Sequence, residues 1–109
     1  MNKMCISVSD DFSEAPGARS KSDGPDSGQE FYESLLRPKF NEAMSNKIIL
    51  EVDMDGTYGY ATSFISESFG TLSKEFGKEI VLKNISIVSN EDIKLKDYVL
   101  KIIQDPNAK

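Results

Sequence analysis

The chain has 109 residues, of which 39% are hydrophobic and 28% are charged, and its formal net charge is −5. This length supports one domain with one hydrophobic core. A single cysteine, Cys5, excludes an internal disulfide. The absence of histidine excludes Ser-His and Cys-His catalytic schemes and, with only one cysteine, argues against a zinc site.

Charge and hydropathy also narrow the class of partner. Residues 1–56 carry the whole net negative charge and residues 57–109 are neutral, which argues against nucleic acid as the main partner. No apolar run approaches the ~18 residues of a membrane span, and the first residues lack the pattern of a signal peptide. We therefore expect a cytoplasmic protein that uses no cofactor or metal and binds neither nucleic acid nor membrane.

The N-terminal segment combines a short strand with a long polar stretch. Residues 4–8 have a β-like apolar pattern, and we expect the thiol of Cys5 to be buried in this strand. Residues 10–26 are rich in Gly, Pro, Ser and Asp, which predicts a long connecting loop. A loop of this length in a small domain is usually functional or mobile.

A first helix is predicted to begin at Ser27. The sequence S-G-Q-E of residues 27–30 matches a capping box, in which the Ser27 hydroxyl accepts from the Glu30 amide and the Glu30 carboxylate reaches back. Apolar residues follow at helical spacing as far as Met44. We expect Pro38 to kink this helix or to restart it.

A strand, a turn and a second helix are predicted next. Residues 48–54 start with a nearly continuous apolar run, which predicts a strand covered on both faces in a mixed or parallel sheet. Residues 55–59 predict a turn. An apolar stripe over residues 62–76 predicts the second helix, and Gly77 is expected to end it.

The last part of the chain predicts one more strand and one more helix. Apolar residues alternate over residues 80–88, which predicts a strand. Ser89 or Asn90 is expected to cap a final helix, which Pro106 ends and which leaves a tail at 106–109. The predicted order is β-loop-α-β-α-β-α, which is typical of an α/β fold.

Two aspartates after the central strand suggest an enzymatic alternative. Asp53 and Asp55, within V-D-M-D-G-T, resemble the first motif of haloacid-dehalogenase-type phosphatases. In that chemistry one aspartate attacks a phosphoryl group and the other donates a proton, usually with Mg²⁺. Such enzymes need further site residues on more α/β units than the rest of this chain can build. Alternatively, both aspartates serve a strand end and a turn.

A longer pattern resembles the bacterial STAS-like domains of unknown function over about residues 4–105. Its blocks are G-P-D-S-G-Q-E-F (24–31), L-L-R-P (35–38), D-M-D-G-T-Y-G-Y-A-T-S-F (53–64) and E-S-F-G-T-L (67–72). The resemblance implies a single STAS-like domain over residues 1–109. It also implies a small α/β sandwich, like that of anti-sigma-factor antagonists, with a mixed sheet and helices packed mainly on one face.

The resemblance further implies a non-enzymatic regulatory or adaptor domain that binds a protein, such as an ATPase of the histidine-kinase-like class. The antagonists are phosphorylated on a serine at the start of the helix after the central strand. There they have Asp-Ser-Ser-Gly, whereas this chain has Ala61-Thr62-Ser63-Phe64. Ser63 and Thr62 are therefore candidate phospho-acceptors, since a phosphate would lie beside helix N-terminal amides. Alternatively, Thr62 is an N-cap and Ser63 a first-turn residue.

The expected contact surface combines the turn 56–60, the start of the second helix and the loop 16–28. A homodimer is also compatible with the sequence. Arg19 either clamps a carboxylate or phosphate or is a solvated loop charge. The candidate partner-binding residues are Thr57, Tyr58, Gly59, Tyr60, Glu67 and Arg19.

Overall fold

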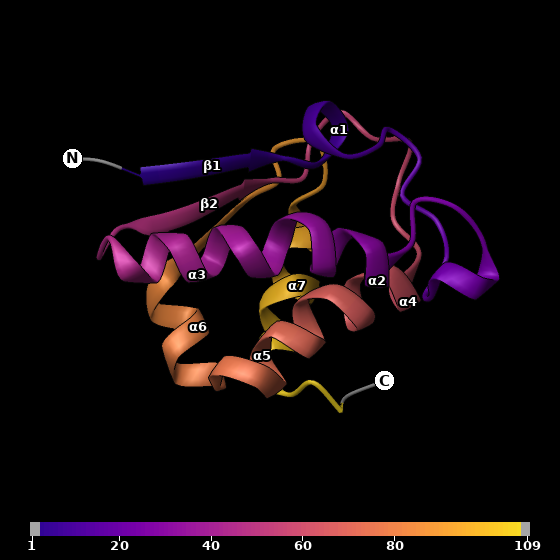
Figure 1. Ribbon diagram of the computed structural model, residues 1–109. Helices are drawn as coiled ribbons and strands as arrows, with labels where there is room; N and C mark the ends of the chain where they lie inside the picture. The colour runs from indigo at the N-terminus through magenta and orange to yellow at the C-terminus, as the bar shows by residue number, and fades with distance from the viewer. Residues whose placement is uncertain (1–2, 108–109) are drawn as a thin grey trace.

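The computed structural model (Figure 1) describes residues 3–107 and contains a three-stranded parallel sheet with helices. The strands are β1 (Lys3–Ser7), β2 (Ile49–Asp53) and β3 (Ile85–Val88), in the spatial order β1-β2-β3. Val52 in the central strand is in register with Ile6 on one side and Ile87 on the other. The α/β class is confirmed. The prediction of a mixed sheet was wrong, because the helical connections return all three strands in the same direction.

Two long helices dominate the connections between the strands. The helical segments are α1 (Val8–Asp11), η1 (Lys21–Asp23), α2 (Gly28–Phe31), η2 (Tyr32–Leu36), α3 (Arg37–Ser45), α4 (Thr62–Ile65), η3 (Ser66–Gly70), α5 (Thr71–Phe76), α6 (Lys78–Asn84) and α7 (Ile93–Gln104). Segments α2, η2 and α3 form the first long helix, residues 28–45, and α4, η3 and α5 form the second, residues 62–76. Among residues 3–107, no helix has the length and hydropathy that a membrane crossing requires.

The sheet buries one face and leaves the other open. Leu50 and Val52 are fully buried, whereas Glu51 and Asp53 on the opposite face are only partly buried. Figure 1 shows α3, α5, α6 and α7 on the same side of the strands. The prediction that β2 is covered on both faces was therefore wrong. The thiol of Cys5 lies beside Glu51 on the open face and is exposed, not buried as predicted.

Ser27 begins the first long helix, as predicted. Its hydroxyl oxygen accepts a hydrogen bond from the amide of Glu30 at 3.0 Å, and the residue is fully buried. Pro38 does not end this helix. The π-helical segment η2 precedes it, and there the amide of Arg37 bonds the carbonyl of Tyr32 five residues back. The expected distortion is thus a widened turn, which accommodates a residue without an amide hydrogen.

The second long helix ends at Gly77, also as predicted. Gly77 has φ of 92°, a conformation that glycine adopts without steric cost. Its amide donates to the carbonyl of Ser73 at 2.8 Å and closes the last turn.

The strand predicted over residues 80–88 is helical in its first half. Only β3 is extended, and the preceding residues form α6. The alternation of Ile80 with Leu82 was misleading, because the fully buried residue is Val81 and Ile80 is 41% exposed. Val81 lies in the first turn of α6, where its amide donates to the carbonyl of Gly77 at 3.0 Å.

The predicted loop 10–26 contains short helical segments and internal hydrogen bonds. β1 ends at Ser7, one residue earlier than predicted, because the Ser7 hydroxyl accepts from the amide of Asp10 at 3.3 Å and caps α1. Further along, the amide of Gly17 donates to the carbonyl of Asp26 at 3.0 Å. This bond brings the two ends of the glycine-rich stretch together around η1.

The final helix, α7, begins later than predicted, with Asp92 as its N-cap in place of Ser89 or Asn90. The Ser89 hydroxyl instead donates to the carbonyl of Asp92 at 2.6 Å. The helix ends before Pro106, as predicted. Residues 108–109 of the predicted tail lie outside the described residues.

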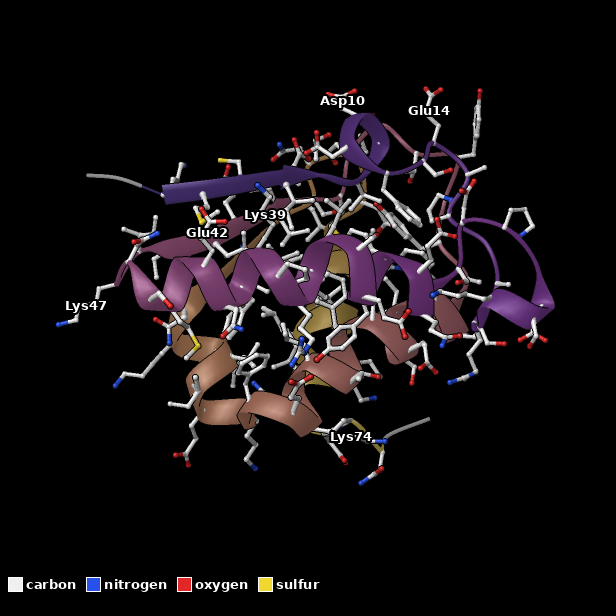
Figure 2. All side chains as sticks on the ribbon, viewed as in Figure 1. Asp10, Glu14, Lys39, Glu42, Lys47 and Lys74 are labelled. Carbon is white, nitrogen blue, oxygen red and sulfur yellow. The ribbon has the colours of Figure 1, made fainter. Side chains whose placement is uncertain are left out.

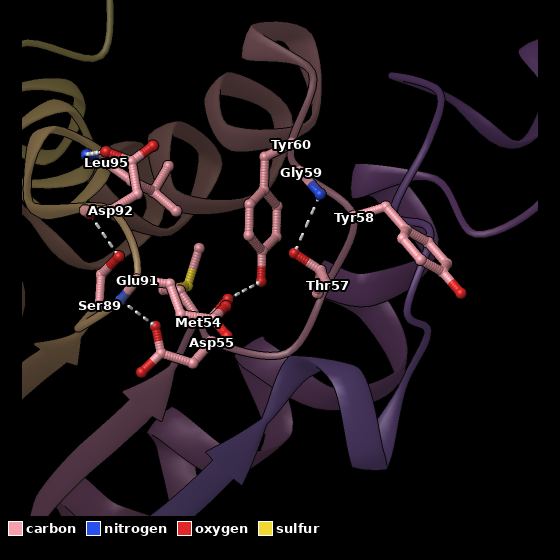
Figure 3. A pocket seen from close by; sticks show the side chains of 10 residues that line it. All are labelled: Met54, Asp55, Thr57, Tyr58, Gly59, Tyr60, Ser89, Glu91, Asp92 and Leu95. Atoms are coloured by element: carbon pink, nitrogen blue, oxygen red, sulfur yellow. Dashed lines mark hydrogen bonds between the residues drawn. The ribbon is translucent and has the colours of Figure 1, made fainter.

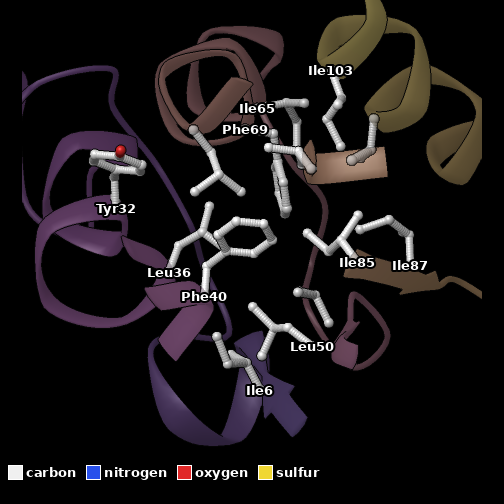
Figure 4. Packing of buried hydrophobic residues seen from close by; sticks show 14 of the residues in the cluster. Ile6, Tyr32, Leu36, Phe40, Leu50, Ile65, Phe69, Ile85, Ile87 and Ile103 are labelled. Atoms are coloured by element: carbon white, nitrogen blue, oxygen red, sulfur yellow. The ribbon is translucent and has the colours of Figure 1, made fainter. Parts of the chain in front are cut away.

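Aromatic side chains join the two long helices. The rings of Phe31 and Phe64 stack with centroids 5.5 Å apart, and Phe69 lies 6.3 Å from Phe31; all three are fully buried. Gly28 allows the close approach, because a Cβ atom there would lie 2.7 Å from the carbonyl oxygen of Phe64. Burial of each such side chain contributes about 1.5–3 kcal/mol. Figure 4 shows the wider packing, which includes Leu36, Phe40, Leu50, Ile65 and Ile85.

Candidate functional site

Two loops at the carboxyl ends of β2 and β3 are held together by reciprocal hydrogen bonds. The Asp55 carboxylate accepts from the amides of Asn90 at 3.1 Å and Glu91 at 2.9 Å. In return, the Glu91 carboxylate accepts from the amide of Gly56 at 2.8 Å. The amides that donate to Asp55 hold the pKa of its carboxyl below the ordinary value, the amide of Glu91 having the largest effect. Asp55 thus links the loop after β2 to the loop after β3 through hydrogen bonds.

Asp53 also bonds the backbone. One of its carboxylate oxygens accepts from the amide of Asp55 at 2.9 Å, which is the Asx-type contact of a turn. A phosphatase of the haloacid-dehalogenase type would need one of these carboxylates as a nucleophile and the other as an acid. Among residues 3–107, no group of three or more Asp, Glu, Cys or His side chains is placed to hold a metal ion.

The two loops enclose a pocket of about 260 Å³, which we call the strand-end pocket (Figure 3). It lies between the turn after β2 and the start of α7. Four of the six predicted partner-binding residues line it, from Thr57 to Tyr60, whereas Arg19 and Glu67 do not. Its lining residues are Met54, Asp55, Thr57, Tyr58, Gly59, Tyr60, Ser89, Glu91, Asp92 and Leu95.

The two tyrosines of the turn differ in exposure. Tyr60 is partly buried, its hydroxyl donates to the carbonyl of Met54 at 3.0 Å, and its ring packs against Phe64 with centroids 5.7 Å apart. Burial raises the pKa of the Tyr60 hydroxyl above its ordinary value. Tyr58 is 87% exposed, and its side chain points away from the pocket (Figure 3). Tyr60 therefore forms a fixed wall, and Tyr58 offers an aromatic ring to solvent.

The loop before the first long helix lies against this turn. The amide of Tyr58 donates to the carbonyl of Glu14 at 2.8 Å. The neighbouring Ser13 hydroxyl donates to the carboxylate of Asp26 at 2.9 Å and so joins the two ends of the loop. The residue that contacts the turn, Glu14, lies just before the segment 16–28 that was predicted to share a surface with it.

Arg19 and Glu67, two predicted partner-binding residues, pair with each other. Their closest charged atoms, Nη1 and Oε1, lie 3.6 Å apart, and the side chain of Arg19 is 52% exposed. The backbone of the same loop covers the start of the first long helix. There the amides of Gly28 and Gln29 donate to the carbonyls of Ala18 and Arg19 at 2.8 and 3.0 Å. Arg19 thus forms an ion pair with a carboxylate of the second long helix while half of its side chain stays in solvent.

Thr62 and Ser63 begin the second long helix. The N-cap is Ala61, so the alternative that Thr62 serves as the N-cap was wrong, and no side chain caps this end. Thr62 is exposed and Ser63 is partly buried in the first turn. Neither residue lines the strand-end pocket. Tyr60, which does line it, precedes Thr62 by only two residues in the chain.

Sequence reasoning missed the second half of the pocket. Ser89, Glu91 and Asp92 lie at the end of β3 and the start of α7. In the sequence they resemble an ordinary helix entry, and their position beside the Asp55 turn depends on β2 and β3 being neighbours. The available signal was the run S-N-E-D after a strand, since the carboxyl ends of adjacent parallel strands meet at one edge.

The comparisons with known proteins gave one match. A family model, described as a STAS-like domain of unknown function, matches residues 27–94, which is more than half of the chain. The matched segment includes both long helices, β2, β3 and most of the strand-end pocket. Neither the search of curated proteins nor that of solved structures gave a match.

Proposed function

The chain belongs to the family of STAS-like domains of unknown function, and from this membership we propose that it is a non-enzymatic regulatory domain that binds a protein partner. The observation that carries this proposal is that the loop before the first long helix is hydrogen-bonded, through Glu14 and Tyr58, to the turn after the central strand. We call the two segments, residues 13–28 and 54–63, the loop end. It contains Tyr58, a residue that is 87% exposed.

Two properties suit the loop end for protein recognition. Tyrosine is enriched among the residues that dominate binding energy, because it buries a large ring and still forms hydrogen bonds. The segments around Tyr58 are also fixed by internal bonds, namely Tyr58 to Glu14, Asp55 to Glu91 and Ser13 to Asp26. A surface already fixed in this way loses little conformational entropy on binding.

The proposed partner is an ATPase of the histidine-kinase-like class or a protein coupled to one. This part of the proposal rests on the resemblance to anti-sigma-factor antagonists. It gains support from Thr62 and Ser63, which lie within the loop end and begin a helix that has no side-chain cap. Phosphorylation of either would add about −1.5 to −2 charges there and change the affinity for the partner.

Affinity capture from the source cells tests the binding. Immobilised wild-type chain, Tyr58→Ala and Ile80→Ala are compared, because Ile80 is an exposed apolar residue on α6 (41%), outside the loop end. We expect wild type and Ile80→Ala to recover the same partner and Tyr58→Ala to recover much less. Equal recovery by all three would refute the assignment of the surface.

Intact-mass measurement tests the switch. After incubation with ATP and the recovered kinase, we expect one added phosphate, which is lost in Ser63→Ala or in Thr62→Ala. A phosphate that maps to any other residue would contradict the proposed phospho-acceptors.

The phosphatase alternative receives no support from the geometry, because both carboxylates bond backbone amides: Asp53 bonds an amide of its own turn, and Asp55 bonds two amides of the loop after β3. Its test is Mg²⁺-dependent turnover of an aryl phosphate. Turnover that Asp53→Asn abolishes would establish the phosphatase and overturn the non-enzymatic proposal.

A further inference from the structure

The strand-end pocket combines apolar walls with acidic side chains. Met54 is almost fully buried, Tyr60 is fixed by its hydroxyl bond, and Leu95 is partly buried on α7. The carboxylates of Glu91 and Asp92 belong to the same lining and are exposed. One end of an entering group would therefore meet apolar surface and the other end negative charge.

These carboxylates have spare acceptor capacity. Glu91 uses one oxygen for the amide of Gly56, and Asp92 uses one for the amide of Leu95 at 3.3 Å. Within residues 3–107, the second oxygen of each accepts no hydrogen bond, and neither residue belongs to one of the four ion pairs. Within the described part of the chain, no lysine or arginine forms an ion pair with either carboxylate.

The surroundings add further negative charge. Asp55 also lines the pocket. Asp10 and Glu14 project outward from the same end of the molecule, whereas Lys47 lies at the far end (Figure 2). Electrostatic complementarity therefore favours a cationic occupant.

The size of the pocket restricts that occupant. Sites for small molecules and cofactors usually have about 300–1,000 Å³, and this pocket has about 260 Å³. It is better matched to a single side chain of a protein. The neighbouring Tyr58, 87% exposed, would contact the partner surface around that side chain.

We propose that the strand-end pocket receives an arginine side chain of the protein partner. The aliphatic part of the arginine packs against Met54 and Leu95, its guanidinium plane stacks on Tyr60, and its N–H groups donate to the free oxygens of Glu91 and Asp92. Arginine fits better than lysine, because its planar group both stacks on aromatic rings and spans two acceptors. This inference rests on the proposed function, since it gives the chemistry of the partner at that same surface.

The probe for this proposal is N-acetyl-arginine methylamide, added to the ¹⁵N-labelled chain and followed by NMR. We expect amide shifts at Gly56, Gly59, Glu91 and Leu95. The citrulline analogue has the same shape without the charge, and we expect it to cause much smaller shifts. Equal shifts with citrulline, shifts only outside the pocket, or no shifts would overturn the proposal. Stronger binding of the lysine analogue would overturn the choice of arginine.

A charge-neutral variant tests the role of the two carboxylates. Glu91→Gln/Asp92→Asn keeps the acceptors for Gly56 and for the α7 cap, so the fold should persist. We expect it to weaken arginine binding roughly threefold to tenfold. The control Glu42→Gln/Glu79→Gln removes the same charge far from the pocket and should bind like wild type. Equal weakening in both variants would show a general charge effect and overturn the pocket assignment.

The outcome is separable from that of partner capture. If Tyr58→Ala abolishes capture while the arginine compound fails to bind the pocket, the proposed function stands and the arginine assignment fails. If the compound binds as expected but no partner depends on Tyr58, the proposed function fails on its own test.

Discussion

Two regions of the molecule differ in how completely their side chains are packed. One is the interface between the two long helices, and the other is the loop end. At the helix interface, Phe31, Phe64 and Phe69 are fully buried and pack together. Gly28 has no Cβ atom, which lets the backbones of the two helices come close to each other. At the loop end, the strand-end pocket lies beside Tyr58, an aromatic residue that is 87% exposed. The side chains of the first region are therefore inaccessible to another molecule. The second region has an open pocket and, within residues 3–107, carboxylates without ion-pair partners.

This difference indicates where stability and binding lie in the chain. Apolar burial dominates the free energy of folding, so the helix interface should control unfolding. Exposed aromatic and charged groups contribute little to folding but much to recognition. Variants at the two regions should therefore separate the two properties.

The largest effect is expected for Phe64→Ala. Its ring contacts Phe31, Phe12 and Tyr60, and its loss should lower the free energy of unfolding by about 3–5 kcal/mol. Denaturant titration measures this value. Phe64→Leu keeps most of the volume and should cost clearly less; a loss below about 1 kcal/mol in Phe64→Ala would show that the helix interface is not the centre of stability.

The next effect is expected for Gly28→Ala, compared with Gly70→Ala. A Cβ at residue 28 would lie 2.7 Å from the carbonyl oxygen of Phe64, whereas one at residue 70 would make ordinary contacts, the nearest at 3.5 Å. Gly28→Ala should lose about 1–3 kcal/mol through overpacking. Gly70→Ala should be neutral or gain up to about 1 kcal/mol, because alanine suits a helix interior. Thermal unfolding of both variants checks this, and equal stabilities would contradict the close approach of the helices.

A smaller effect is expected for Asp55→Asn, and it should depend on pH. The pKa of the Asp55 carboxyl is lowered in the folded chain, so the carboxylate stabilises the fold above its unfolded pKa of about 3.9 and loses this contribution as pH falls through the folded pKa. We expect a difference from wild type of roughly 1 kcal/mol at neutral pH, reduced by solvent screening.

Unfolding free energies measured from pH 7 to pH 2 would show this dependence. The difference between wild type and Asp55→Asn should shrink below about pH 4. A difference that stays constant over this range would mean that the two amide bonds do not depend on the charge of Asp55.

The smallest effect on stability is expected for Tyr58→Ala. The side chain of Tyr58 is mostly in solvent, and its bond to Glu14 uses the backbone amide, which the substitution keeps. The free energy of unfolding should change by less than about 0.5 kcal/mol, as judged by denaturant titration beside the capture experiment. A larger loss would mean that Tyr58 is a folding residue and would remove the contrast between the two regions.

Local signals predicted much of the fold. The cap at Ser27, the helix over residues 62–76 and its end at Gly77 all depend on side chains within a few residues of each other. The errors came from contacts distant in sequence. The exposure of Cys5 follows from the open face of the sheet, and the burial of Val81 in place of Ile80 follows from the packing of α6.

Only one of the two segments that form the candidate site could be predicted from the sequence. The turn around Tyr58 has a recognisable sequence, and four of its residues do line the pocket. Glu91 and Asp92 come from a segment more than 30 residues later, and Asp55 reaches it only because β2 and β3 are neighbours. The pairing of Arg19 with Glu67 likewise needs the loop to fold back over the first long helix.

Hydrogen–deuterium exchange of the chain, alone and with its captured partner, tests most directly whether the loop end is the binding surface. We predict that amides in residues 13–28 and 54–63 and at the start of α7 exchange more slowly in the complex, while those of α6 are unchanged. Slower exchange confined to α6 or to the open face of the sheet would contradict this prediction.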